Sequence, residues 1–218
     1  MKEKQKMKEK VKEFIVKNLK WIILFICLIG FLAIAEDVFN KEIMNGDIVG
    51  YKLISTFLIS DFATPIAKFI TNFGGAIFLA VLTIILFILI KNKKIGVSIF
   101  SNLVIITALN QLLKNILQRP RPTEYRIIEE TGYSFPSGHS MISMAFYGYI
   151  IYLIYKYVTN KYIKWISIVL LSILICSIGI SRIYLGVHYT SDVLGGFSIS
   201  ISYLVIYISA VNKFLIEK

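Results

Sequence analysis

Charged residues and cysteine are both scarce in this 218-residue chain. Only 17% of the residues are charged and 56% are hydrophobic, whereas soluble domains average about 25% charged and 45–50% apolar residues. This composition excludes an ordinary soluble domain, and its high hydrophobicity also excludes a disordered chain. The two cysteines, Cys27 and Cys176, lie within long apolar runs, which excludes a secreted scaffold built on disulfides. Length and composition favour one domain embedded in a bilayer.

A cleavage site for a signal peptide is also lacking, because no small-residue motif follows the first apolar run. That run is preceded by residues 2–20, which contain eight of the 24 basic residues. A lysine-rich segment before an apolar run is typical of a cytoplasmic anchor. The net charge of +11 is therefore concentrated near the membrane, and we expect no nucleic-acid partner. We predict a basic cytoplasmic segment over residues 1–20 and a single transmembrane domain over residues 21–218.

Six apolar segments approach the length of a membrane span. A helix needs about 20 residues to cross a hydrocarbon core of about 30 Å. Residues 21–35 reach this length if residues 14–20 join them, with Lys17 and Lys20 extending toward the headgroups. The other five segments carry no charge and are residues 73–90, 95–113, 140–155, 165–181 and 193–212. The sequence therefore predicts an all-α fold, an integral-membrane bundle of six transmembrane helices.

Residues 48–72 are apolar but are interrupted by three charged residues and a proline. These are Lys52, Asp61, Lys68 and Pro65. A charge in the middle of a bilayer costs about 2.5–3.5 kcal/mol on insertion scales. We therefore expect two short amphipathic helices at the membrane interface, turning near residues 61–65, between the first and second spans.

The distribution of charge predicts the orientation of the bundle. With six spans and a cytoplasmic N-terminus, 16 of the 24 basic residues lie inside, and the outer side carries eight together with nine of the 13 acids. This bias agrees with the positive-inside rule. We expect a multi-pass protein of the cell membrane with both termini in the cytoplasm.

Arginine and histidine depart from this pattern, because all of them fall on the predicted outer side. The chain has 20 lysines but only four arginines and two histidines, which are Arg119, Arg121, Arg126, Arg182, His139 and His188. Arginine binds phosphate through two parallel hydrogen bonds. The arginines therefore indicate a phosphate-bearing ligand on the outer face.

Three polar stretches lie at the outer ends of the third to sixth spans. They contain Lys114 and Arg121; Ser137, Gly138 and His139; and Arg182, His188 and Asp192. Alternating topology brings these stretches together in one extracytoplasmic pocket. The cations Lys114, Arg121 and Arg182 would repel one another unless an anion lay between them, and a phosphate or diphosphate is the natural occupant.

Ser137 and Gly138 precede the fourth span, where backbone N–H groups and the helix dipole favour an anion. Gly138 allows the backbone to approach a ligand closely, and the Ser137 hydroxyl adds a donor. An ordinary capped helix start has the same sequence pattern.

His188 and Asp192 are four residues apart, so on a helical turn their side chains share a face. A carboxylate on one imidazole nitrogen fixes the tautomer and leaves the other nitrogen as a nucleophile. Alternatively, Asp192 caps the last helix and His188 packs at an interface. His139 is then available as a general acid for the leaving oxygen. The same three residues could bind a metal, but the nearby cations disfavour one, so we expect neither a metal nor a cofactor.

The motifs Lys114-x6-Arg121-Pro122, Pro136-Ser137-Gly138-His139 and Ser181-Arg182-x5-His188-x3-Asp192 together resemble those of the type 2 phosphatidic acid phosphatase superfamily, the lipid phosphate phosphatases. The resemblance implies that His188 attacks phosphorus to form a phosphohistidine, that Asp192 orients it, and that His139 protonates the leaving group and later activates water. It implies that Lys114, Arg121, Ser137, Gly138 and Arg182 bind the phosphoryl oxygens without a metal. Residues 21–218 would then form one transmembrane phosphatase domain. The soluble vanadium haloperoxidases share such a site but lack the spans, so they fit poorly.

The resemblance implies an enzyme that removes phosphate from a lipid phosphate or diphosphate on the extracytoplasmic face. We favour undecaprenyl diphosphate, a carrier recycled in cell-wall synthesis, because the expected site faces outward in a small chain of bacterial character; phosphatidylglycerol phosphate and phosphatidic acid are alternatives. A lipid phosphotransferase, in which an acceptor hydroxyl replaces water, is a further alternative. The intact His139, His188 and Asp192 argue against a non-catalytic membrane scaffold. Residues 48–72 are expected to form part of the entrance for the lipid.

Overall fold

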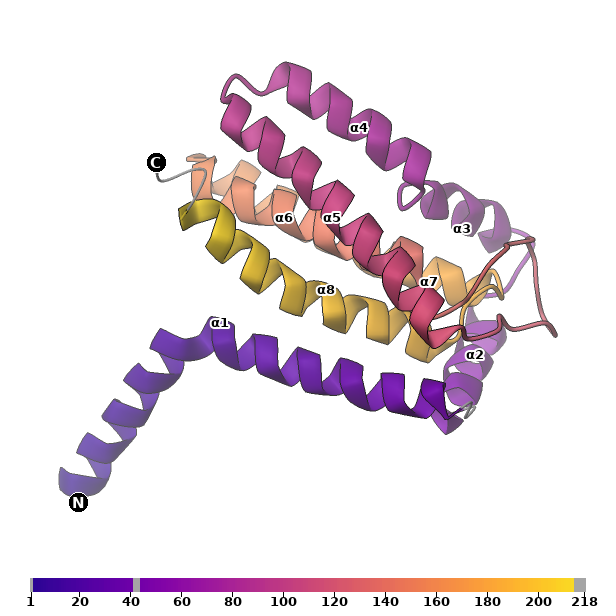
Figure 1. Cartoon of the computed structure of the whole chain (residues 1–218), viewed down its shortest axis with the longest axis horizontal. Coiled ribbons are helices and arrows are strands. Elements are labelled where there is room, and N and C mark those ends of the chain that lie inside the picture. Colours follow the sequence, from indigo (N-terminus) through magenta and orange to yellow (C-terminus); the bar gives the residue numbers. More distant parts are fainter. Residues whose placement is uncertain (1, 41–43, 214–218) are drawn as a thin grey trace.

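The structure of the protein is a computed structural model that describes residues 2–40 and 44–213. All regular secondary structure in these ranges is helical (Figure 1). The eight helices are α1 (Lys2–Phe39), α2 (Asn45–Phe57), α3 (Ala63–Asn72), α4 (Ala76–Leu89), α5 (Lys93–Leu117), α6 (Gly138–Tyr157), α7 (Lys161–Tyr184) and α8 (Thr190–Val211). The predicted all-α fold is confirmed.

Polar caps determine where several of these helices begin. The side chain of Asn92 accepts a hydrogen bond from the backbone N–H of Lys94 at the start of α5. Asn160 accepts one from the backbone N–H of Tyr162 at the start of α7. Such caps satisfy N–H groups that have no partner within the helix. As a result, α5 and α7 each begin before the apolar segment that predicted them.

Among the described residues, four helical segments are long and apolar enough to cross a membrane, which are Val16–Phe39 within α1, α5, α7 and α8. The pair α3 and α4 forms a fifth candidate, with a bend of 50° at the break between them. Alone, α4 has 14 residues and is roughly 21 Å long, which is shorter than the hydrocarbon core. The protein is therefore an integral membrane protein, while the count of six spans stays a prediction.

The helix α6 corresponds to the expected fourth span but is not among these candidate segments. It packs against α5, α7 and α8, so much of its surface contacts protein. Tyr149 at its centre is 1% exposed and donates a hydrogen bond of 2.8 Å to Ser98 Oγ on α5. Hydrogen bonds between helices stabilise membrane bundles, where burial of apolar surface gives little driving force. Tyr149 thus serves the packing of α6 against α5.

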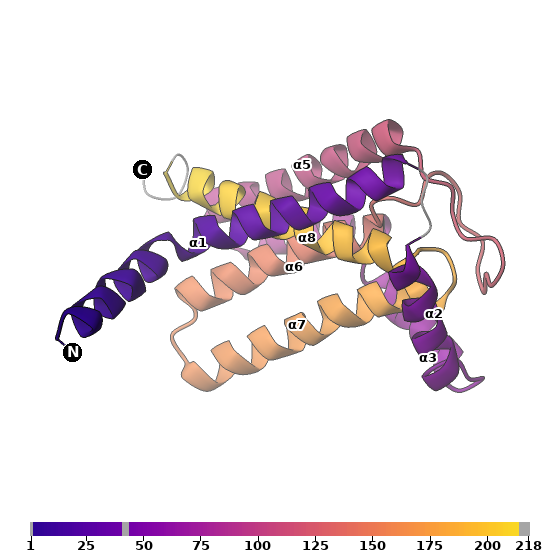
Figure 2. The ribbon, with the colours of Figure 1, turned by 90° about the horizontal axis from the view of Figure 1, so that it is seen from below.

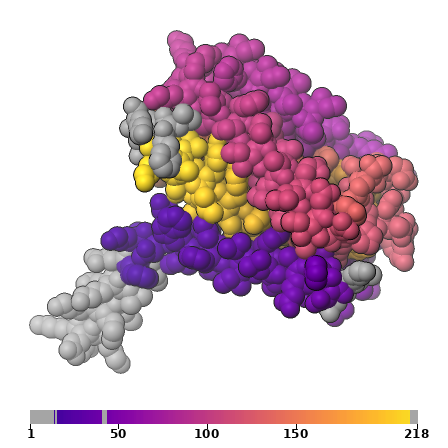
Figure 3. Space-filling model, viewed as in Figure 1, coloured from indigo at the N-terminus to yellow at the C-terminus, as the bar shows by residue number. Residues whose placement is uncertain are grey.

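The outer surface of the bundle is apolar. Ile77, Ile88 and Leu170, for example, are 83%, 67% and 60% exposed. A soluble monomer rarely exposes so many apolar side chains together, whereas lipid is an apolar solvent for them. Figure 3 shows α8 between α1 and α5 on one face of this surface. The exposed apolar side chains agree with a bundle that contacts lipid.

The short helices α2 and α3 and the loop of residues 118–137 gather at one end of the bundle, opposite to the start of α1 and the end of α8 (Figures 1 and 2). The break between α2 and α3 spans residues 58–62, slightly earlier than the predicted turn near residues 61–65. Pro65 lies in the first turn of α3, where a missing N–H removes no helical hydrogen bond. The two short helices are present, and their position at the membrane interface stays a prediction.

Candidate active site

The eight residues predicted to form the site all lie at this end of the bundle, each near a helix end or in a connection between helices. They are Lys114 (last turn of α5), Arg121 (loop 118–137), Ser137, Gly138 and His139 (start of α6), Arg182 (last turn of α7), His188 (turn between α7 and α8) and Asp192 (first turn of α8). The structure brings them together as the alternating topology predicts.

Backbone contacts fix the three motif stretches relative to one another. The backbone N–H of Ser137 donates to the carbonyl oxygen of Asp192 at 3.0 Å, which joins the start of α6 to α8. Asn110 of α5 donates to the carbonyl oxygen of Pro136 at 3.2 Å. A Cβ atom on Gly138 would lie 3.1 Å from Asn110 Oδ1, so glycine permits the close approach of α5 and α6 here.

The turn between α7 and α8 depends on Gly186, which occupies one of the unspecified positions of the third motif. Its φ is +69°, and a Cβ atom there would collide with the carbonyl oxygen of Tyr125. Glycine accepts both this left-handed backbone and this close approach. The backbone N–H of Ile127 also donates to the carbonyl oxygen of Leu185 at 3.0 Å. The loop that carries Arg121 is thereby fixed against the turn that carries His188.

His188 and Asp192 form a hydrogen-bonded pair. Nδ1 of His188 lies 3.2 Å from Oδ2 of Asp192, and Nε2 lies 3.1 Å from Nη1 of Arg121. Because a guanidinium only donates hydrogen bonds, Nε2 is unprotonated and Nδ1 carries the proton toward Asp192. Asp192 Oδ2 also accepts a hydrogen bond of 2.9 Å from the backbone N–H of Tyr189. The N-cap of α8 is Tyr189, so the alternative that Asp192 itself is the N-cap is wrong; Asp192 lies at the third helical position and stabilises the helix start from there, while it also contacts His188.

Ser137 has the capping role that the sequence left open. Its Oγ accepts hydrogen bonds from the backbone N–H and the hydroxyl of Ser140, at 3.5 and 3.0 Å. Its own hydroxyl hydrogen is a further donor. Lys114 lies near Gly138 and donates from Nζ to the carbonyl oxygen of Tyr133.

Arg182 reaches the site from α7 and is 1% exposed. It donates to Thr71 Oγ1 at 2.8 Å and to Glu130 Oε1 at 2.5 Å. Its Nε is buried without a hydrogen-bond partner among the residues that the structure describes. A buried guanidinium N–H normally has an acceptor, and a phosphoryl oxygen would provide one.

Glu130 contributes a negative charge among the cations. Burial raises its pKa, but the hydrogen bond and charge of Arg182 and the charge of Arg121 lower the pKa overall. The carboxylate is therefore ionised and offsets part of the positive charge at the site. A phosphate bound at the free Nε of Arg182 would compete with Glu130 for the positive charge of this guanidinium.

The positive charges and burial also lower the pKa values of both histidines. Burial lowers the pKa of His188 to about 4, with contributions from Arg182 and Arg121, although Asp192 opposes this shift. Burial and the charges of Arg182, His188 and Arg121 lower the pKa of His139, which directly precedes the predicted fourth span, to about 2. With only protein charges around them, both imidazoles are neutral at neutral pH. A phosphate dianion would raise both pKa values by offsetting the cations.

Asp192 has a second basic partner outside the motifs. Arg119 donates from Nη1 to Asp192 Oδ1 at 2.8 Å and from Nη2 to Asp47 Oδ2 at 2.7 Å. Asp47 belongs to α2 and is 3% exposed. This contact links the first short helix directly to the histidine–aspartate pair.

Only two of the four arginines are placed to bind phosphate. The common location of the four arginines predicted a phosphate ligand, and the structure reduces the candidate arginines to two. Arg119 pairs with carboxylates. Arg126 donates to the carbonyl oxygen of Pro122 and lies 3.6 Å from Glu129. Arg121 and Arg182 therefore remain as candidate phosphate ligands.

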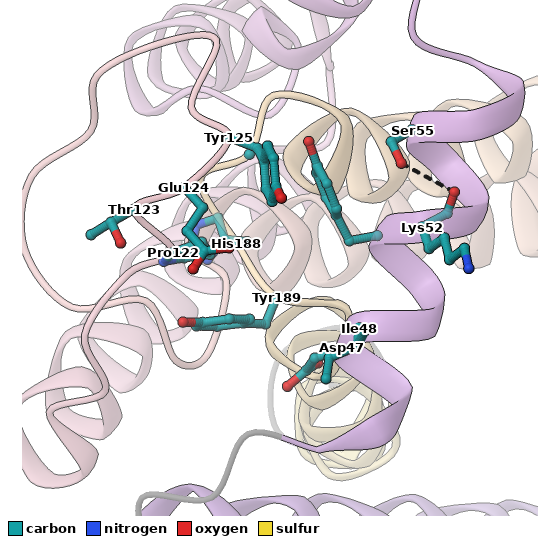
Figure 4. A pocket seen from close by; sticks show the side chains of 12 residues that line it. Asp47, Ile48, Lys52, Ser55, Pro122, Thr123, Glu124, Tyr125, His188 and Tyr189 are labelled. Carbon is teal, nitrogen blue, oxygen red and sulfur yellow. Dashed lines mark hydrogen bonds between the residues drawn. The ribbon is translucent and has the colours of Figure 1, made fainter.

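A cavity of about 730 Å³ opens beside His188, between α2 and the loop 118–137 (Figure 4). Its walls include Ile48, Tyr51 and Lys52 on α2, with Tyr125 on the loop. The rings of Tyr51 and Tyr125 stack with their centroids 4.9 Å apart. A cavity of this size with apolar walls and a few polar groups is typical of a small-molecule site.

Sequence reasoning missed three polar side chains at the site, namely Asp47, Thr71 and Glu130, and it grouped Arg119 with the phosphate-binding arginines although Arg119 pairs with carboxylates. The available signal was that Asp47 and Glu130 are charged residues on the predicted outer side, but no spacing rule connects them to the motifs. Within the described residues, no group of three or more histidine, cysteine, aspartate or glutamate side chains is arranged to hold a metal ion. The expectation of no metal and no cofactor stays a prediction.

The sequence profile of the PAP2 superfamily matches residues 94–216, more than half of the chain. The chain therefore belongs to the PAP2 superfamily, the family that its motifs resemble. The matched region contains all eight residues of the candidate site.

Three curated relatives have names of lipid phosphatases. Phosphatidylglycerophosphatase B of Bacillus subtilis is 41% identical over 95 residues, which cover 43% of this chain and about half (46%) of that protein. Undecaprenyl-diphosphatase of Sulfolobus acidocaldarius is 27% identical over 164 residues, which cover 72% of this chain and 71% of that protein. Dolichyldiphosphatase 1 of Dictyostelium discoideum is 30% identical over 137 residues, which cover 61% of this chain and 58% of that protein.

Two solved structures share the fold. A transmembrane PAP2 type phosphatidylglycerolphosphate phosphatase from Bacillus subtilis superposes with a TM-score of 0.76 at 27% identity, covering 88% of this chain and 96% of that chain. The LpxE protein of Aquifex aeolicus gives a TM-score of 0.60 at 24% identity, covering 73% of this chain and 92% of that chain. The second likeness concerns the fold alone.

Proposed function

We propose that this protein hydrolyses a lipid phosphate or diphosphate through a phosphohistidine intermediate at His188. The observation that carries the proposal is the pair of contacts made by the His188 ring, Nδ1 to Asp192 and Nε2 to Arg121. The Nδ1–H of His188 faces Asp192, so the lone pair of Nε2 is directed toward Arg121 and the other cations. The names of the relatives in the PAP2 superfamily agree with this class of reaction.

In the first step, Nε2 of His188 attacks phosphorus, and the bond between phosphorus and the leaving oxygen breaks. His139 donates a proton to that oxygen. The nonbridging oxygens gain negative charge in the transition state and are stabilised by donors already in place. These donors are Lys114, Arg121, Ser137, Gly138 and Arg182.

In the second step, water attacks the phosphohistidine and the bond between phosphorus and Nε2 breaks. His139, now neutral, takes the proton of the water. Inorganic phosphate leaves, and His188 returns to the tautomer held by Asp192. Positive side chains supply the electrostatic stabilisation in both steps, so we expect the reaction to proceed without a metal.

Substrate binding requires one hydrogen bond and one ion pair to rearrange. Arg121 Nη1 lies 3.1 Å from Nε2 of His188, on the side from which phosphorus must approach. Glu130 holds Arg182 through a contact of 2.5 Å. A substrate phosphate would bind both guanidinium groups, draw Arg121 away from Nε2 and release Glu130.

Undecaprenyl diphosphate is the substrate that we favour. The relatives from Sulfolobus and Dictyostelium are named as phosphatases of polyprenyl-type diphosphates. Phosphatidylglycerol phosphate is the alternative supported by the Bacillus relative, and phosphatidic acid is a further one. The cavity beside His188 supports an entrance for the lipid that α2 helps to form.

We place this site on the extracytoplasmic face of the cell membrane. The proposed topology has six spans, with α6 and the pair α3–α4 among them, and with both termini in the cytoplasm. The basic residues 2–20 would lie at the cytoplasmic surface, and α2 with the first part of α3 at the outer interface. The asymmetry of lysine supports this orientation.

The experiment that tests the function measures phosphate release from undecaprenyl diphosphate by the purified full chain in detergent with excess EDTA. Wild type is expected to release phosphate, and His188→Ala is expected to lose at least about 1,000-fold in kcat, as loss of a nucleophile does in other covalent mechanisms. Phosphatidylglycerol phosphate and phosphatidic acid are assayed in parallel. Release by His188→Ala at the wild-type rate would contradict the assignment of the nucleophile.

A lipid phosphotransferase would use the same intermediate but pass the phosphoryl group to an acceptor hydroxyl. Product analysis separates the two reactions, because a transferase yields a phosphorylated acceptor in place of free phosphate. We favour hydrolysis because the relatives are named as phosphatases.

A further inference from the structure

Arg119 and Asp47 form a buried ionic cluster with Asp192 that the proposed reaction leaves unexplained. The side chains of Arg119, Asp47 and Asp192 are 6%, 1% and 0% exposed. Burying three ionised groups is costly unless each is paired and hydrogen-bonded. The ring of Tyr189 also covers Arg119, with its centroid 4.1 Å from the guanidinium carbon. This cluster contacts the His188–Asp192 pair through Asp192, which indicates a functional role for it.

The hydrogen bonds of the cluster divide the two oxygens of Asp192 between two partners. Oδ1 accepts from Arg119 at 2.8 Å, whereas Oδ2 faces Nδ1 of His188 at 3.2 Å. Two partners on different oxygens fix the plane of the carboxylate. The carboxylate in turn fixes the imidazole ring, because Nδ1 has one direction in which to donate.

Asp47 holds Arg119 in this position from the other side. Its Oδ2 accepts from Arg119 at 2.7 Å, and its Oδ1 accepts from the backbone N–H of Ser191 at 2.8 Å. Arg119 also donates to the hydroxyl of Ser191 at 2.7 Å. The cluster thus ties α2 to the first turn of α8, next to Asp192.

We propose that Arg119 is a positioning residue for the His188–Asp192 pair, and that Asp47 of α2 anchors Arg119 and balances its charge. This inference rests on the proposed function only for its effect on turnover. Arg119 acts through Asp192 and does not touch the phosphate.

The electrostatic consequence has opposite signs for the two partners. His188 is faced by Asp192 of α8, Arg121 and Glu130 of the loop, Arg182 of α7 and His139 of α6. Lys114 of α5 also faces Asp192. The Tyr189 hydroxyl faces the cluster and, in addition, Glu124. Removing the Arg119 charge leaves Asp192 less neutralised, which favours protonated His188. Removing the Asp47 charge leaves the positive charge of Arg119 less neutralised, which disfavours protonated His188.

A titration of the histidine rings tests this directly, because the chain contains two histidines. The full chain is labelled with 13C-histidine in detergent, and His139→Gln identifies the signal of His188 by difference. In Arg119→Gln the titration midpoint of His188 is expected to rise by about one pH unit. In Asp47→Asn it is expected to fall. Arg119→Lys keeps the charge, and Arg126→Gln removes a loop arginine outside the cluster, so both should leave the midpoint within a few tenths of a unit.

Phosphate release supplies the second readout. Arg119→Gln is expected to lower kcat by about 10–100-fold with KM within about three-fold, as expected when a catalytic group is misoriented. Arg119→Lys is expected to recover part of kcat, and Arg126→Gln to match wild type. Failure of the proposed function would appear as a wild type that releases no phosphate while the titration still reports on Arg119.

Three results would overturn the inference. One is a His188 midpoint that is the same in wild type, Arg119→Gln and Asp47→Asn. Another is a shift of the same sign in both variants. The third is an increase in KM with unchanged kcat, which would place Arg119 in substrate binding. If Arg119→Gln does not fold, the expected fall in Asp47→Asn and the unchanged midpoint of Arg119→Lys carry the test.

Discussion

The charges on a few side chains decide what the site can do at the scale of single residues. His188 must be neutral to attack phosphorus, and its burial among cations keeps its pKa near 4. His139 must carry a proton to assist the leaving group, yet the same cations lower its pKa to about 2. The two requirements are met together only when the negative charge of the substrate offsets the cations and raises the pKa of His139. Substrate binding therefore allows His139 to carry the proton that it donates.

Because the two histidines must be in opposite protonation states, we expect a bell-shaped dependence of kcat on pH. Activity is lost at low pH as His188 becomes protonated and at high pH as His139 loses its proton in the substrate complex. His139→Gln is expected to remove the alkaline limb and to lower kcat by about 10²–10⁴-fold. The measurement is kcat from about pH 5 to 9 under conditions in which the chemical step limits the rate. A flat wild-type profile under those conditions would count against the two-histidine assignment.

At the scale of elements, the same side of α2 takes part in both the ionic cluster and the cavity, because Asp47 belongs to the cluster and also lines the cavity. Asp47 at its start belongs to the ionic cluster with Arg119, while Ile48 and Tyr51 line the cavity beside His188. Leu53 on the same helix is 55% exposed and lies outside the cavity lining. The helix thus connects the proposed lipid entrance to the group that positions the nucleophile.

Filling this cavity should affect long lipids more than short ones. Ile48→Trp is expected to raise KM for undecaprenyl diphosphate by roughly ten-fold, equivalent to about 1.4 kcal/mol of binding free energy. A short-chain diphosphate should be affected less, since less of its tail passes α2. Leu53→Trp introduces the same bulk on the exposed face and is the matched control. Equal KM increases from both variants would argue against an entrance at α2.

At the scale of the whole molecule, the sequence predicted the helical fold and the convergence of the motifs because both depend on local patterns. Apolar segments define spans, and their alternation brings Lys114, His139 and His188 to one end. The partners of these residues depend on tertiary contacts that no spacing encodes. Asp47 comes from α2 and Thr71 from α3, and each reaches the site only after the chain has folded. Tyr149 of α6 likewise finds its partner, Ser98, on another helix.

The same limit applies to the arginines. Their common location predicts a phosphate ligand, but the sequence cannot distinguish a guanidinium that faces phosphate from one that faces carboxylates. Arg182 retains a buried Nε without a partner in the described chain, whereas the terminal nitrogens of Arg119 are bound to Asp47, Asp192 and Ser191. The difference becomes visible only in three dimensions.

The most direct test of the central claim is to trap the phosphoryl group on the protein. The full chain is mixed rapidly with undecaprenyl diphosphate labelled with 32P in its terminal phosphate, quenched in alkali, in which phosphohistidine is stable, and mapped by mass spectrometry. We predict label on His188 that appears before free phosphate, disappears on a chase with unlabelled substrate, and is absent in His188→Ala. An active enzyme that carries label on another residue would contradict the account.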